Sequence, residues 1–95
     1  MSQVIAAAVE ALNAKVGGFD EGTAKFVIED EGAIMLDSDG AREGDEEAEV
    51  TLKANRDTFE GMLNGDVNPT TAFMTGKLKV EGNMGLAMKL GSALA

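Results

Sequence analysis

The chain has 95 residues, enough for one domain, and a formal net charge of −9 from 17 acidic and 8 basic side chains. Because the basic residues are few and scattered, nucleic acid is not expected as a partner, and membrane contact is expected to be transient at most. The chain has no Cys and no His, which removes disulfides, Cys–His zinc sites and the commonest general base. We expect no cofactor and no metal. No secretory signal is visible, and the cytoplasm is the default location.

The first segment, residues 3–16, has the periodicity of an amphipathic helix. Its apolar residues fall on one arc at a spacing of 3.6 residues: Val4, Ile5, Ala8, Val9, Leu12 and Val16. Ser2 is a possible N-cap, and Gly17-Gly18 ends the helix. One face of this helix must therefore pack against another element.

The middle of the chain changes to a period of two, which is typical of strands with one buried face. Residues 24–28 and 33–36 are predicted to form a hairpin, with Glu31-Gly32 as part of its turn. Residues 41–44 suit a short third strand after the turn residues 37–40. Residues 48–54 alternate most cleanly, with apolar side chains inward and polar ones outward.

Helical periodicity returns after this strand in two short segments. Asn55 is predicted to cap the first, which ends at Asn64-Gly65. Asn68-Pro69 is an N-cap followed by Pro at the first helical position of the second, which ends at Gly76. The segments carry apolar residues at helical spacing: Phe59, Met62, Leu63, Ala72, Phe73 and Met74.

The last part of the chain is predicted to be a strand at residues 77–81 and a helix from Asn83, its N-cap, to about Leu94. The apolar residues of this helix cover more than half its circumference: Met84, Leu86, Ala87, Met88, Leu90, Gly91, Ala93 and Leu94. A helix lying on a sheet needs an apolar stripe of only about 100°. The surplus predicts a second apolar contact: a ligand, a partner subunit or another helix.

The element order is helix, antiparallel strands, two short helices, strand and helix, which predicts an α+β fold with helices on one face of the sheet. The acidic stretch 37–49 does not match a calcium-binding EF-hand loop, because Arg42 stands sixth and Ala48 twelfth from Asp37. The carboxylates of residues 45–49 have no apolar setting that would separate their pKa values for acid–base catalysis. A solvated acidic loop is the expected structure there.

Two segments carry a family resemblance: residues 64–69 (NGDVNP) and residues 72–83 (AFMTGKLKVEGN). They resemble the sterol carrier protein 2 family, whose signature there is a Gly-x-x-x-Pro turn, an Ala-Phe-Met helix and then Gly-Lys-Leu-x-Val-x-Gly. The resemblance is specific from about Ala48 to Leu94. It implies a single domain over residues 1–95, with a five-stranded, mainly antiparallel sheet covered on one face by about four helices and enclosing an apolar tunnel.

The resemblance also implies non-covalent binding and carriage of a lipid, such as a fatty acid, fatty acyl-CoA, sterol or phospholipid. The lining carried over by element is Ile34, Leu36, Phe59, Met62, Leu63, Phe73, Met74, Leu86, Met88 and Leu90. The alternative is a protein-interaction or dimerisation module that uses the same apolar helical face. An enzyme would need groups that the chain lacks, so no catalytic residue is expected. The partners predicted are a small apolar ligand and, at most, a second copy in a weak homodimer.

Overall fold

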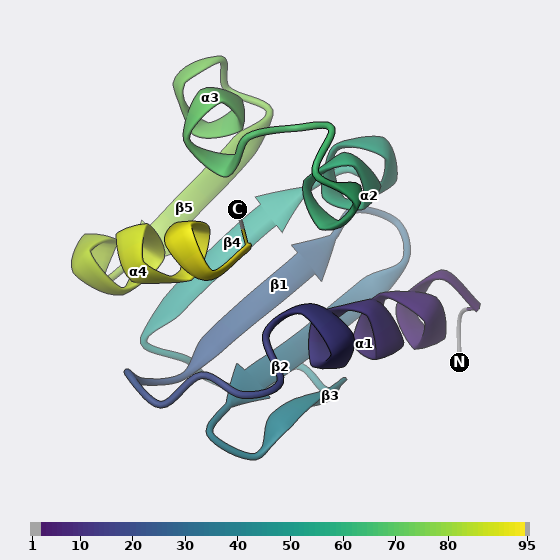
Figure 1. The fold of residues 1–95 in the computed structure, drawn as a ribbon, viewed down its shortest axis with the longest axis vertical. Coiled ribbons are helices and arrows are strands. Elements are labelled where there is room, and N and C mark those ends of the chain that lie inside the picture. The colour runs from purple at the N-terminus through teal and green to yellow at the C-terminus, as the bar shows by residue number, and fades with distance from the viewer. Residues whose placement is uncertain (1–2, 95) are drawn as a thin grey trace.

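The computed structural model describes residues 3–94, in which helices and strands form two layers (Figure 1). In chain order the elements are α1 (Gln3–Lys15), β1 (Ala24–Ile28), β2 (Gly32–Asp37), β3 (Gly40–Glu43), β4 (Val50–Ala54), α2 (Arg56–Asn64), α3 (Pro69–Met74), β5 (Leu78–Gly82) and α4 (Met84–Leu94). The helices lie on one face of the sheet, which confirms the predicted α+β class (Figure 1). No described helix has the length and apolar character that crossing a bilayer demands.

The five strands pair in the order β3-β2-β1-β4-β5. All neighbours are antiparallel except the central pair, β1 and β4, which is parallel, so the sheet is mixed but mainly antiparallel as expected. Phe26 of β1 lies opposite both Ile34 of β2 and Leu52 of β4, and Leu52 lies opposite Val80 of β5. Because side chains alternate along a strand, this row of apolar residues shares the face that the helices cover.

Two helices divide that face between them. Helix α1 packs on β2 and β3, whereas α4 packs on β4 and β5 (Figure 1). Ile5 and Leu12 of α1 and Leu90 of α4 are fully buried, and the core runs continuously between them through the sheet residues. Helix α2 contacts α1, and α3 contacts α4 and β5. The core is therefore one cluster under both helices, and the part of it below α3 and α4 borders the site described next.

The predicted helix ends agree with the structure where residues are described. The Asn55 side chain accepts a hydrogen bond from the Thr58 amide at 2.8 Å, and Gly65 ends α2 in the left-handed region with φ 84°. Asn68 accepts from the amides of Thr70 and Thr71 at the start of α3. Asn83 accepts from the Leu86 amide at 3.1 Å. The predicted N-cap at Ser2 lies outside the described residues.

The strand boundaries shift by one or two residues from those predicted. Strand β4 begins at Val50 rather than residue 48, because the Glu49 amide bonds to Thr23, ahead of β1, instead of joining the ladder. Gly32 opens β2 rather than lying in the turn. The left-handed turn position is taken by Asp30, with φ 66°.

Candidate functional site

An apolar hollow of about 420 Å³ lies between the sheet and the C-terminal helices. Its floor is formed by strand residues from β1, β4 and β5, and α2, α3 and α4 form its walls. The described residues that line it, called the apolar groove from here on, are Phe26, Leu52, Met62, Pro69, Thr70, Phe73, Met74, Leu78, Val80, Met84, Ala87, Met88, Gly91, Ser92 and Leu94. Its volume lies within the range typical of small-molecule sites.

The rim of the apolar groove is formed by four large apolar side chains that are exposed to water. Phe73 and Met84 are 43% and 46% exposed, and Met74 and Met88 are 79% and 73% exposed. Among the described residues these four are the large hydrophobic side chains that remain exposed, and all four line the apolar groove. Scattered exposed apolar side chains are ordinary, but a concentration of them at one hollow marks a binding surface.

The sequence of α4 explains how the apolar groove stays open. Leu86, Leu90 and Leu94 of α4 are buried, and they anchor the helix on the core. Met84 and Met88, one turn apart, stand on the neighbouring arc and point their apolar side chains at the groove rim. Gly91 approaches α3 closely, since a Cβ placed there would lie 3.8 Å from Cβ of Pro69. The surplus apolar face predicted for this helix is thus the face that lines the groove.

The ten residues proposed from the sequence as a lining fall into three places. Met62, Phe73, Met74 and Met88 lie together in the apolar groove. Ile34, Leu36, Leu86 and Leu90 are buried in the core and are not among the groove residues. Phe59 and Leu63 line a second hollow between α1 and α2. The structure therefore brings four of the ten together at one site.

The residues that form the floor of the apolar groove were not among those predicted from the sequence. The floor consists of Phe26, Leu52, Leu78 and Val80, and the walls add Pro69, Met84, Ala87, Gly91 and Leu94. The period-two pattern places each floor residue on the inward face of its strand, so the signal was present. What the pattern lacked was the strand order, which sets β1, β4 and β5 side by side beneath α3 and α4.

The apolar groove has little polarity. Among the described lining residues none is ionisable, and the hydroxyl groups of Thr70 and Ser92 are the polar side chains. The resolved pKa changes lie elsewhere, in the β2–β3 hairpin. There Arg42 Nη1 donates to Asp37 Oδ2 at 2.8 Å and lowers the pKa of that carboxyl, with help from the Asp39 amide. The groove thus offers apolar contact, and its described lining supplies no group for proton transfer.

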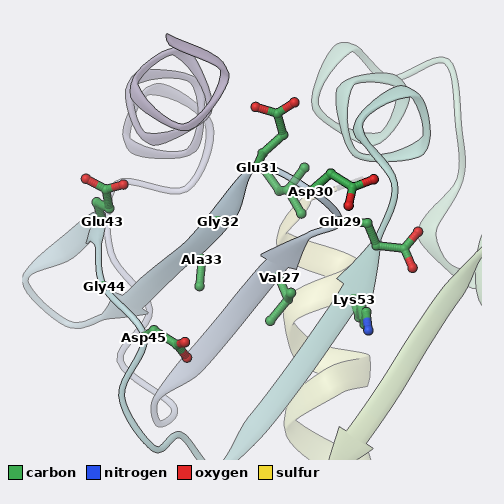
Figure 2. Close-up of a pocket in the computed structure, with 11 residues that line it drawn as sticks. Val27, Glu29, Asp30, Glu31, Gly32, Ala33, Glu43, Gly44, Asp45 and Lys53 are labelled. Atoms are coloured by element: carbon green, nitrogen blue, oxygen red, sulfur yellow. The ribbon is translucent and has the colours of Figure 1, made fainter. Parts of the chain in front are cut away.

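A larger hollow, of about 690 Å³, lies on the opposite face of the sheet (Figure 2). Val27 and Ala33 form its floor, and Figure 2 shows carboxylates spread around its margin, on the β1–β2 turn, at the end of β3 and in the segment that follows β3. The described lining includes five acidic residues and one basic residue: Glu29, Asp30, Glu31, Glu43, Asp45 and Lys53. This chemistry opposes an apolar ligand. Within residues 3–94 no group of three His, Cys, Asp or Glu is arranged to hold a metal.

The sheet with helices on one face and an uncharged apolar groove defines a small α+β domain with a site suited to an apolar molecule. The model of the SCP-2 sterol transfer family matches residues 2–95, and the chain belongs to that family. Human hydroxysteroid dehydrogenase-like protein 2 is 38% identical over 76 residues, which cover 80% of this chain and 17% of that protein. Human sterol carrier protein 2 is 48% identical over 46 residues, 48% of this chain and 8% of that protein. The matched region is thus about a sixth of the length of hydroxysteroid dehydrogenase-like protein 2 and a smaller share of sterol carrier protein 2.

Solved structures support the fold over nearly the whole chain. Sterol carrier protein 2 like 2 from Aedes aegypti has a TM-score of 0.78 at 19% identity, covering 94% of each chain. Sterol carrier protein-2 from Aedes aegypti, solved in complex with the C16 fatty acid palmitate, has a TM-score of 0.77 at 20% identity, covering 100% of this chain and 97% of that one. The five-stranded sheet with helices on one face is therefore the fold of this family.

Proposed function

We propose that the chain binds one acyl chain, or a lipid of similar shape, non-covalently in the apolar groove and carries it without transforming it. The observation that carries the proposal is the exposure of the apolar rim. Four large apolar side chains are exposed to water around a single hollow, whereas the other large apolar side chains of residues 3–94 are buried or partly buried. A ligand that filled the groove would remove these side chains from water.

The energy of that contact is sufficient for tight binding. Fully burying a side chain of this size is worth roughly 1.5–3 kcal/mol, so covering the exposed parts of the four is worth about 4–7 kcal/mol. Each buried methylene of the ligand adds about 0.8 kcal/mol, and association costs at least about 4 kcal/mol. We expect a dissociation constant of about 1 μM or below, which corresponds to about −8 kcal/mol.

A fatty acid is the first ligand to test. It matches the uncharged lining, and the similar fold from Aedes aegypti was solved with palmitate. Delipidated protein is titrated with a fluorescent fatty acid while circular dichroism verifies that it remains folded. Saturable binding with one site per chain is expected. Folded protein that shows no saturable binding would remove the carrier function.

The second candidate function is a protein-interaction module, in which another polypeptide covers the same rim. It is favoured by the length of the curated relatives, in which the matching region is 17% of the whole protein. Native mass spectrometry of protein purified from cells separates the two. A co-purified mass of a few hundred daltons supports the carrier, and a dimer without such a mass supports the interaction module.

A further inference from the structure

A second, smaller hollow adjoins the part of the core that borders the apolar groove. It has a volume of about 270 Å³ and lies between α1 and α2. The described residues that line it, called the outer hollow, are Val4, Ala7, Ala8, Ala11, Arg56, Phe59, Glu60, Leu63 and Asn64. Its α1 side is thus formed by Val4 and small apolar residues, and its α2 side joins apolar side chains to a polar margin.

The two hollows share no lining residue, but a ring contact joins a side chain of one to a side chain of the other. Phe59 lines the outer hollow, whereas Phe26 and Met62 line the apolar groove. The rings of Phe26 and Phe59 are in edge contact, with centroids 5.4 Å apart and planes at 64°. Met62 follows Phe59 by three residues on α2, so the two side chains lie on the same side of the helix. We call these three residues the partition; none is more than 3% exposed.

We infer that the partition sets the length of acyl chain that the apolar groove accepts, with Phe59 as the side chain that determines this specificity. The inference rests on the proposed function. Phe26 and Met62 are the groove residues that adjoin Phe59, so a chain that enters from the methionine rim reaches the partition beside them. Phe59 stands behind them and fills the space through which the chain would otherwise continue. A smaller side chain at position 59 would connect the groove with the outer hollow.

The inference has a measurable signature in a series of ligands. While an added methylene still enters the groove, it should tighten binding about fourfold, the equivalent of about 0.8 kcal/mol. Once the chain end reaches the partition, further methylenes stay in water and the affinity should level off. The chain length at which this happens, the break point, is a property of the partition and not of overall stability.

The experiment measures competition by saturated fatty acids, from octanoate to stearate, against a bound fluorescent fatty acid. The proteins are the unmodified chain, Phe59→Leu and Phe59→Ala, with Leu63→Ala as the matched control because Leu63 lines the outer hollow outside the partition. Phe59→Leu keeps most of the buried apolar volume, so it decides the question if Phe59→Ala does not fold. The break point should move to longer acids in the Phe59 variants and remain unchanged in Leu63→Ala.

A further variant tests where the additional chain goes. Ala11 lines the outer hollow from α1 and is half-buried, so Ala11→Leu should fill that hollow. It should leave the break point of the unmodified chain unchanged and restore it in the Phe59→Ala background. An unmoved break point in folded Phe59 variants, or a shortened one in Ala11→Leu alone, would overturn the inference. Failure of every acid to bind the unmodified chain would instead refute the proposed function.

Discussion

Replacing Met88 by Asp should weaken fatty acid binding strongly while leaving the unliganded fold intact. Met88 lies on the rim of the apolar groove and is 73% exposed, so its side chain contributes little to the core. Exposed substitutions of this kind change the free energy of unfolding by about 0.5 kcal/mol, and the lower helix propensity of Asp adds a similar amount. A bound chain, however, must cover this position.

The minimum size of the effect follows from the exposed fraction of Met88. Full burial of a methionine side chain is worth roughly 1.5–3 kcal/mol, so covering the part now exposed is worth about 1–2 kcal/mol. Losing that contact alone weakens binding about 5–30-fold. The carboxylate must also be desolvated or turned away to water, which adds to the loss. We therefore expect a reduction at the upper end of this range or beyond it.

Two measurements check this prediction. Titration with a fluorescent fatty acid gives the dissociation constant, and thermal melting gives the stabilisation by ligand. At a free ligand concentration of about 100 times Kd, mass action stabilises the unmodified domain by about 2.7 kcal/mol and raises its Tm by roughly 10–20 °C. Met88→Asp should lose most of that rise at the same ligand concentration. Ala93→Asp places the same charge on an exposed position of α4 outside the groove lining and should retain it. Equal affinity in the two variants would refute the assignment of the groove.

The remaining predictions concern salt, membranes, acid stability and capping. Fatty acid affinity should change less than about twofold with salt, because apolar burial drives it; a steep loss in a salt titration would place the binding energy in the headgroup charge. Sedimentation with anionic vesicles should be no stronger than with neutral ones, since the net charge of −9 opposes it, and stronger anionic binding at low salt would contradict this. Arg42 lowers the pKa of Asp37 below its ordinary 3.8, so the charged carboxyl stabilises the fold above that value and loses this effect as pH falls through the lower folded pKa. Asp37→Asn should therefore unfold at a lower urea concentration than the unmodified chain at pH 7. The two proteins should unfold at the same urea concentration at a pH below the folded pKa of Asp37, where the carboxyl is protonated. Asn55→Ala removes the N-cap of α2 and should cost about 1 kcal/mol in urea denaturation, whereas no loss would mean that another group caps the helix.

Local features of the fold could be predicted from the sequence because they depend on neighbouring residues. The caps at Asn55, Asn68 and Asn83 each require one polar side chain at a helix start, and the structure contains all three. Gly65 likewise ends α2 because the left-handed position there suits a residue without Cβ. The broad apolar face of α4 also followed from periodicity alone, and its exposed methionines, Met84 and Met88, form part of the rim of the groove.

The position of the site within the buried face was harder to predict, because periodicity identifies a face and not a part of it. Leu36 and Leu52 both point inward from their strands, yet Leu36 packs into the core while Leu52 reaches the groove. The difference arises from the strand order, which sets β2 and β4 on opposite sides of β1, with β2 beneath α1 and β4 beneath α4. Phe59 likewise lies one turn before Met62 on α2, yet Phe59 lines the outer hollow whereas Met62 lines the groove, and periodicity does not distinguish the two positions.

The methionine distribution offers the most direct test that a ligand occupies the apolar groove. Four methionines line it, namely Met62, Met74, Met84 and Met88, whereas Met35 belongs to β2 and is buried outside it. Protein labelled with ¹³C at the methionine methyl groups is titrated with a fatty acid, and contacts between these methyls and the acyl chain are recorded by NMR. We predict contacts and resonance shifts at the four groove methyls and none at Met35. Saturable binding that leaves the four groove resonances unmoved, or contacts at Met35 instead, would contradict the account.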